Sequence, residues 1–199
     1  MRHRFLSFCI SLNLLIACNN NKQQGDITIT SEDGKTTAKA EPGNPVQSEE
    51  AIQKRKEELQ KLSPYTLDQI KAFLPEELAG AKRSKLSVNG AMGTAYAEGE
   101  YEINDSTRME LKLFDCAGPA GVGIYNTQYL GTISLQSEDD KEYTKTIDLN
   151  GSKAIEQWRK DGSRATIVYM AADRLFVTLE GRNTGIDLLE KAAGNLRLK

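Results

Sequence analysis

The chain has 199 residues, of which 26 are lysine or arginine and 28 are aspartate or glutamate, so its net charge is −2. This slightly acidic balance leaves no basic excess to neutralise phosphates, which argues against a nucleic-acid partner. The chain has 3 cysteines and 1 histidine, which limits the disulfide and metal chemistry open to it.

The N-terminal segment has the parts of a signal peptide. Arg2 and Arg4 form a basic flank, and residues 5–16 form an apolar run that is too short to span a bilayer. The run ends in Leu-Ile-Ala-Cys at positions 15–18, which resembles the lipobox of bacterial lipoproteins. The resemblance implies cleavage just before Cys18 and acylation of that residue, and two or more acyl chains hold a protein stably at a membrane. The alternative is an ordinary secretory signal or a buried N-terminal helix.

The residue after Cys18 indicates the membrane to which a lipoprotein would be transported. It is Asn19 and not an aspartate, and the resemblance to lipoproteins then implies transport to the outer membrane. Residues 20–24 contain no acidic cluster of the kind that directs a lipoprotein to the cell surface. The sequence therefore predicts an outer-membrane protein that is lipid-anchored and faces the periplasm.

Loss of the signal peptide, residues 1–17, also removes reactive side chains. His3 and Cys9 lie within it, so the mature chain has no imidazole for Ser-His-Asp or Cys-His catalysis or for a zinc site. With Cys18 acylated, Cys116 has no cysteine to pair with. We therefore expect no internal disulfide, no metal and no cofactor.

Residues 18–47 are predicted to be the lipidated cysteine followed by a polar tether. As a flexible chain this segment reaches about 30 Å. Within it, Ile27–Thr30 and Lys35–Thr37 flank an Asp-Gly pair that favours a hairpin turn. An isolated two-stranded ribbon is marginal in water, so we expect disorder or a weakly held ribbon.

Residues 48–199 are predicted to form the globular domain, and the domain begins with helices. Residues 48–62 form a peripheral helix, capped by Ser48 and stopped by Ser63-Pro64. Thr66 and Gln69 have the spacing of a capping box for a second helix. Pro75 ends or kinks this helix, and one further helical turn follows, over residues 76–78.

The hydrophobic period then changes to two, which indicates strands. The first two are 94–103 and 108–115. A three-residue loop between them would place Glu98 opposite Lys112, Tyr101 opposite Met109 and Glu102 opposite Arg108, which keeps apolar and charged faces separate.

The rest of the domain is predicted to contain four more strands and two helices. A glycine-weakened helix follows Cys116, and a closing helix spans 185–193. Because residues 167–170 and 175–179 are largely apolar on both faces, we expect their hairpin to be central and covered on both sides. The predicted strands are 143–149, 153–159, 164–170 and 174–180. The fold class is therefore α+β, a single mostly antiparallel sheet of about six strands with helices on both faces.

Three stretches carry a resemblance to a known group of domains. Phe73–Leu78, Gly90–Gly93 and Asp173–Val177 resemble uncharacterised bacterial envelope lipoprotein domains, whose layout is similar to the Mog1/PsbP-like α/β/α sandwich. The resemblance covers the chain from about Thr66 onwards. It implies an assembly factor or an accessory binder, and it supplies no catalytic residues.

Four residues are candidates for a groove or a thiol site. Cys116 precedes a glycine-rich loop, where a thiolate can be activated, although a buried structural cysteine is the simpler interpretation. Tyr125, Tyr129 and Trp158 are candidates for lining a groove, or else they are core residues.

Other motifs are weaker. The glycines of residues 118–123 match neither the dinucleotide nor the P-loop pattern. Glu98, Glu100 and Glu102 could collect calcium, but a solvated strand face is simpler. Residues 148–151 carry a fragment of a calcium-loop spacing and lack the rest.

The leading hypothesis is a lipid-anchored, non-catalytic binding or accessory module for an envelope protein or a small ligand. The missing histidine and the absence of a nucleophile–base motif favour it over an enzyme. The alternatives are a structural envelope lipoprotein and a thiol-dependent enzyme that uses Cys116.

Overall fold

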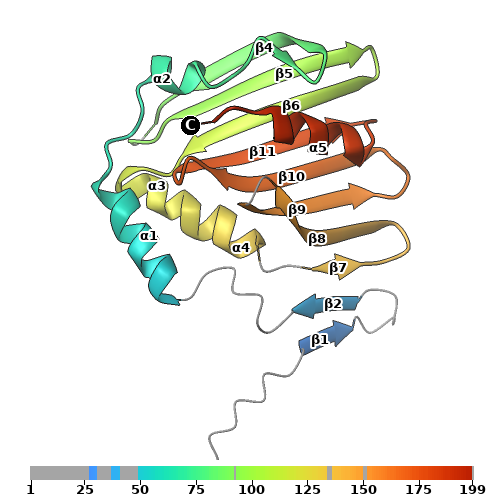
Figure 1. Ribbon diagram of the computed structural model, residues 1–199, viewed down its shortest axis with the longest axis horizontal. Helices are drawn as coiled ribbons and strands as arrows, with labels where there is room; N and C mark the ends of the chain where they lie inside the picture. The colour runs from blue at the N-terminus through green and yellow to red at the C-terminus, as the bar shows by residue number, and fades with distance from the viewer. Residues whose placement is uncertain are drawn as a thin grey trace, which may run out of the picture.

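The computed structural model describes residues 27–30, 37–40, 49–91, 93–133, 136–149 and 152–198. The predicted signal peptide, the lipidated Cys18 and most of the predicted tether lie outside this part of the chain. Eleven strands form one sheet, and every neighbouring pair is antiparallel (Figure 1). The strands are β1 (Ile27–Thr30), β2 (Thr37–Ala40), β3 (Glu77–Leu78), β4 (Ala81–Asn89), β5 (Tyr96–Asn104), β6 (Thr107–Asp115), β7 (Ser137–Glu138), β8 (Glu142–Leu149), β9 (Ser152–Arg159), β10 (Arg164–Ala171) and β11 (Leu175–Arg182).

The order across the sheet is β1-β2-β7-β8-β9-β10-β11-β6-β5-β4-β3. The helical segments are short, and among the described residues none is long and apolar enough to cross a membrane. They are α1 (Glu49–Lys61), α2 (Leu67–Lys71), α3 (Gly118–Ile124), the π-helical turn η1 (Tyr125–Tyr129), α4 (Leu130–Thr132) and α5 (Ile186–Asn195).

The main core lies on one face of the sheet, because alternate residues of the strands point to the same side. This face packs against α2 and α5, and α5 lies across β10 and β11 (Figure 1). The helices contribute Ile70, Leu189, Ala192 and Ala193. The strands contribute large buried side chains, among them Tyr101, Met109, Leu111, Leu113, Ile167, Leu175, Val177 and Leu179.

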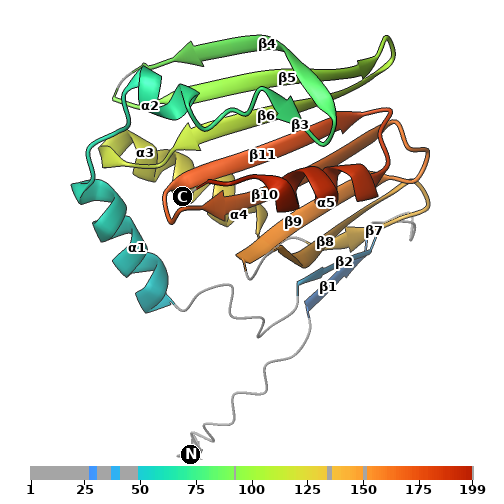
Figure 2. The ribbon, with the colours of Figure 1, turned by 45° about the horizontal axis from the view of Figure 1, so that its top comes forward.

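The second face of the sheet is covered over only part of its area. Figure 2 shows α3 and α4 behind the sheet, on the side opposite α5. A smaller core forms there, in which Leu59 of α1 and Tyr129 of η1 pack with Val168 and Phe176. The alternate positions of β5, β6 and the end of β11 carry charged side chains on this same side, so no apolar helix can cover them. We call this uncovered area the polar face.

The predicted fold class is wrong. Nine strands, β3 to β11, make up the main sheet in place of about six, and the hairpin of β1 and β2 extends it at one edge. Among the described residues the few helices leave the polar face uncovered, so this part of the chain does not form the predicted helical layers on both faces. The protein is still a mixture of α and β structure, but the sheet dominates it.

Several local predictions are confirmed. The capping box of α2 is present, with Thr66 and Gln69 bonded reciprocally. The predicted pairing of β5 with β6 is also found, including Glu98 opposite Lys112 and Tyr101 opposite Met109. The alternation of apolar and charged residues predicted this register correctly. The predicted three-residue loop is wrong: Asn104 pairs with Thr107 across a two-residue turn, and a register shift between Glu102 and Asn104 restores the predicted pairing.

Two other local predictions are wrong. Residues 77 and 78 form the strand β3, which pairs with β4, and not a helical turn. The period-two alternation of the predicted strand 94–103 places Ile103 on the same side as Tyr101, towards the core, but Ile103 is 42% exposed. A register shift between Glu102 and Asn104 turns its side chain outward.

Part of the predicted tether joins the sheet. β1 pairs with β2, and β2 pairs through Thr37 and Ala38 with β7 at the sheet edge. The second strand was predicted over Lys35–Thr37, and the structure describes strand from Thr37 to Ala40. Residues 31–36, which include the predicted Asp-Gly turn, lie outside the described residues.

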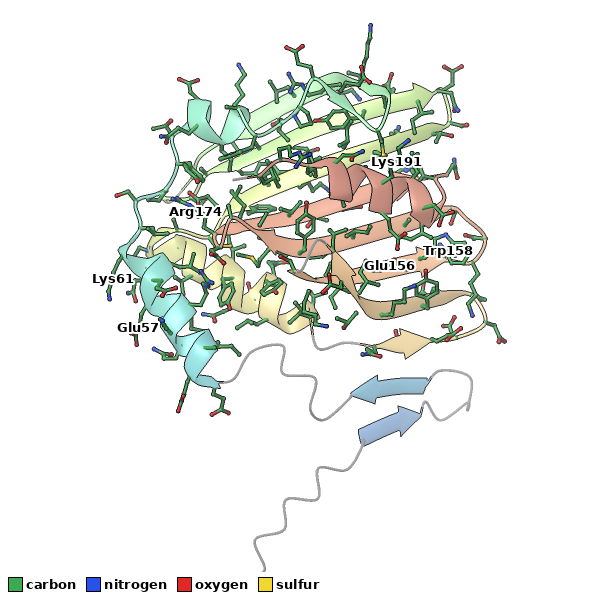
Figure 3. All side chains as sticks on the ribbon, in the orientation of Figure 1. Glu57, Lys61, Glu156, Trp158, Arg174 and Lys191 are labelled. Carbon is green, nitrogen blue, oxygen red and sulfur yellow. The ribbon has the colours of Figure 1, made fainter. Side chains whose placement is uncertain are left out.

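A buried ion pair ties the α1–α2 connection to the sheet. Asp115, at the end of β6, accepts hydrogen bonds from Arg174 Nε (2.9 Å) and Nη2 (2.6 Å) and from the backbone N–H of Tyr65 (2.7 Å). Arg174 also donates to the Ser63 carbonyl (2.9 Å), and its guanidinium lies 3.7 Å from the centre of the Tyr65 ring. The pair therefore fixes the chain between the two helices against the strand ends (Figure 3).

Candidate functional site

The predicted site residues do not gather in one place. Cys116, Tyr125 and Tyr129 belong to the smaller core, and the two tyrosine rings stack with centroids 5.6 Å apart. Trp158 packs at the edge of the main core, on the opposite face of the sheet, with its ring 5.7 Å from that of Tyr143. The three residues around η1 are thus interior packing residues, and Trp158 lies apart from them.

The surroundings of Cys116 disfavour a reactive thiol. The side chain is fully buried. Burial, and then the negative charge of Asp115, raise the pKa of the thiol to about 12. Because the thiolate is the nucleophilic form, this cysteine is inert at neutral pH.

Folded protein is therefore expected to resist alkylation at Cys116. Iodoacetamide at pH 8 should leave the Cys116 peptide unmodified, as judged by mass spectrometry. The same peptide should be modified quantitatively in concentrated urea. Alkylation of the folded protein at the rate seen in urea would contradict the buried placement.

The polar face brings together charged side chains from three neighbouring strands. Glu100 of β5 lies opposite Glu110 of β6, and Glu110 lies opposite Glu180 of β11. Like charges directly opposite each other destabilise a sheet. Such a row is maintained only where other groups compensate it.

Cations compensate this row of carboxylates. Lys112 Nζ lies 3.3 Å from Glu110 Oε2 and 3.0 Å from Glu180 Oε1. Arg164 Nη2 lies 2.9 Å from the other oxygen of Glu180. Lys85 Nζ lies 3.1 Å from Glu100 Oε2. Each of the three carboxylates therefore has a basic partner.

Two carboxyl groups on the polar face, those of Glu98 and Glu110, shift each other's pKa in opposite directions. A hydrogen bond with Glu98 raises the pKa of Glu110, and the same contact, with the hydroxyl of Tyr96, lowers the pKa of Glu98. Two adjacent carboxyl groups cannot both ionise easily, so one retains its proton to a higher pH.

A row of arginines runs beside the carboxylates. Arg108 of β6 lies opposite Arg182 of β11, which lies opposite Arg164 of β10. Arg164 is paired with Glu180, whereas neither Arg108 nor Arg182 has an acidic group within 4.0 Å in the described part of the chain. Two arginines on adjacent strands therefore lie opposite each other without an acidic partner among the described residues.

The two rows border a hollow in the surface, with a volume of about 310 Å³. It lies at the ends of β6, β10 and β11, and β5 closes one side. It is lined by Glu100, Arg108, Glu110, Ser163, Arg164, Glu180, Gly181 and Arg182. The sequence predicted a solvated face for the glutamates of β5 but did not identify this hollow.

A second buried carboxylate lies on the opposite face, beneath α5. Glu156 of β9 is fully buried; it accepts a hydrogen bond from the hydroxyl of Tyr143 and pairs with Lys145 Nζ at 2.9 Å (Figure 3). Burial alone raises its pKa, but these two donors outweigh it and lower the pKa. In the part of the chain that the structure describes, the Oε2 atom of Glu156 has no donor. A contact with this carboxyl raises the pKa of Glu190 on α5. Ionised Glu190 is thus repelled by Glu156, whereas protonated Glu190 can donate to it.

Replacing Glu190 by glutamine is expected to stabilise the fold at neutral pH. The folded pKa of Glu190 is raised, so its contribution is present at low pH and is lost as the pH rises through that pKa. The glutamine amide supplies a permanent donor, but Glu190 is exposed to solvent, so the expected gain is at most about 0.5 kcal/mol at pH 7 and almost nothing at pH 4, where Glu190 itself is protonated. Urea unfolding of both proteins at the two pH values measures the difference.

The matched control is Glu57→Gln, at an exposed site on α1 where the carboxylate accepts a hydrogen bond from Gln53. This change should be nearly neutral at both pH values. An equal effect of the two substitutions at pH 7, or a Glu190→Gln effect that does not depend on pH, would argue against the carboxyl pair.

The chain matches no protein-family model, no curated protein and no solved structure. The resemblances to envelope lipoproteins and to the Mog1/PsbP-like sandwich therefore receive no support from relatives.

Proposed function

We propose that the protein is a lipid-anchored lipoprotein of the outer membrane that faces the periplasm, and that its domain binds a small ligand without converting it. The lipobox at positions 15–18 supports the anchor. The observation that carries the binding role is the hollow on the polar face, where Arg108 and Arg182 lack an acidic partner among the described residues.

The arrangement of the hollow favours binding over a purely structural role. Opposed like charges in a sheet cost stability, and natural proteins tend to keep such conflicts at functional sites. The volume, about 310 Å³, falls at the lower end of the range for ligand pockets. A small polar molecule fits both the size and the charges.

The buried position of the Cys116 thiol supports a non-catalytic role. Cys116 is buried, has a raised pKa and lies in the smaller core, away from the polar face. The chain carries 1 histidine, which lies in the predicted signal peptide. Thiol chemistry in the hollow therefore has no supporting residue.

A thermal-shift screen with a chemically mixed set of small molecules tests the binding role on the full chain. We expect at least one compound to raise Tm, because a ligand that binds only the native state stabilises it. Ser163→Trp, which places an indole in the hollow, should abolish this shift. Ser87→Trp, on β4 away from the hollow, should keep it. No stabilising compound, or a shift that survives Ser163→Trp, would reject the proposal.

Metabolic labelling with a palmitate analogue tests the anchor separately. The protein should be labelled and should sediment with membranes, and Cys18→Ala should be unlabelled and soluble. If the wild-type protein is unlabelled, or if Cys18→Ala still sediments, the anchor is wrong.

A further inference from the structure

We propose that the ligand of this hollow carries a phosphate monoester, bound between Arg108 and Arg182, and that hydroxyl groups on the rest of the ligand face the carboxylates. This inference rests on the proposed binding function and assigns the chemical class of its ligand. It follows from three features of the hollow: which charges are already paired, how the unpaired ones are spaced, and where the carboxylates lie.

Some charged side chains around the hollow have an ion-pair partner among the described residues, and others do not. Each of its three carboxylates has a basic partner: Glu100 pairs with Lys85, Glu110 with Lys112, and Glu180 with both Lys112 and Arg164. Arg108 and Arg182 have no acidic partner in the described ranges. Glu102, which lies opposite Arg108 on β5, is not within 4.0 Å of it. The uncompensated charge of the hollow is therefore positive and amounts to two guanidinium groups.

The spacing of these two groups favours phosphate over a single carboxylate. Residues directly opposite each other in an antiparallel pair have Cα atoms about 4.5–5.5 Å apart, so the two guanidinium groups can reach one anion. A carboxylate has two oxygens and satisfies one guanidinium fork. A phosphate monoester has three terminal oxygens and a charge near −2 at pH 7, so it can bond both forks and neutralise both charges.

The carboxylates of the hollow indicate which chemical groups the rest of the ligand carries. Glu100, Glu110 and Glu180 line the side of the hollow next to the arginine row. They repel a second anionic group and accept hydrogen bonds from hydroxyls. The hollow also has more room than a phosphate group alone fills. A small hydroxylated phosphate monoester therefore matches both the charged rows and the volume.

Isothermal titration of the full chain in low-salt buffer tests this assignment with three probes: inorganic phosphate, glycerol 3-phosphate and the soluble lipid dihexanoyl phosphatidic acid. All three carry the phosphate group, and tighter binding of the second or the third distinguishes a free metabolite from a lipid headgroup. We expect Arg108→Gln and Arg182→Gln each to weaken binding of the best probe at least about tenfold, because a hydrogen bond to a charged group is lost. The double variant should show no binding.

Arg159→Gln is the matched control. Arg159 is an exposed arginine of β9 that already lies 3.7 Å from Asp161, so its loss should change affinity less than about twofold. The variants at 108 and 182 should fold, with Tm equal to or above that of the wild type, because one of two opposed like charges is removed. Their thermal midpoints separate loss of binding from loss of folding.

The experiments distinguish failure of the phosphate assignment from failure of the proposed binding function. If none of the three probes binds, but the screen finds another ligand that Ser163→Trp excludes, the phosphate assignment is wrong and the binding function stands. If no ligand of any kind is found, both fail. Equal weakening by Arg159→Gln would also overturn the assignment, since it would show a general charge effect.

Discussion

Replacing Arg174 by leucine is expected to destabilise the domain by about 3–5 kcal/mol, because it leaves the carboxylate of Asp115 buried without a cation. Asp115 is fully buried, and Arg174 Nη2 lies 2.6 Å from its Oδ2. The change also removes the donor to the Ser63 carbonyl and the contact with the Tyr65 ring. The chain between α1 and α2 would lose its main link to the sheet.

Urea unfolding followed by circular dichroism measures this effect, and a neighbouring ion pair supplies the control. Arg55 lies 2.8 Å from Asp173, the residue next to Arg174, but that pair is at the surface, with Asp173 81% exposed. Arg55→Leu should therefore cost less than about 1 kcal/mol. If both changes cost the same, the buried pair does not have the role assigned to it.

Replacing Gly121 by alanine is expected to destabilise the domain by about 3 kcal/mol, at the upper end of what overpacking costs. Gly121 lies in α3, and a Cβ atom there would be 2.3 Å from the backbone carbonyl carbon of Cys116. The obstacle is main chain and not a flexible side chain. The helix and the end of β6 would therefore have to move apart.

Gly123, two residues further along the same helix, tests whether this cost is steric. A Cβ atom there meets nothing within 4 Å. Gly123→Ala should stabilise the protein by about 0.5–1 kcal/mol, since alanine favours the helix. Thermal unfolding of the two variants should give shifts of opposite sign. Shifts of the same sign would contradict the close packing of α3 on Cys116.

The elements that the sequence predicted well have a clear local signal. The pairing of β5 with β6 followed from apolar and charged residues that alternate along two strands joined by a short turn. The hairpin of β10 and β11 was expected at the centre because its residues are apolar on both faces, and it lies between β9 and β6. In both cases, the residues that indicate the pairing or the position of the strands are close together in the sequence.

The strands that the sequence missed lack such a signal. β4 is near the sheet edge and exposes most of its side chains, so its residues show no alternation. β3 and β7 have only two residues each. The fold class was wrong for this reason: a sheet of short and exposed strands cannot be counted from hydrophobic period alone.

The arginine row could not be predicted because it depends on long-range register. Arg108, Arg164 and Arg182 come from three strands, and β6 is separated from β11 in the sequence by the helical segment and four strands. Only the pairing of β6 with β11 and of β11 with β10 places them in one row. The glutamates of β5 were visible as an alternating set, but without that register they indicated only a solvated face.

On the proposed assignment, a phosphate-bearing ligand binds at the arginine end of the polar face. The most direct test of this claim is a titration of the isotopically labelled protein with glycerol 3-phosphate, followed through the backbone amide signals by NMR. The largest shifts are predicted at Arg108, in residues 163–164 and in residues 181–182, which line the hollow. Shifts concentrated instead around Glu156 and α5, or around Cys116 and η1, would contradict the claim.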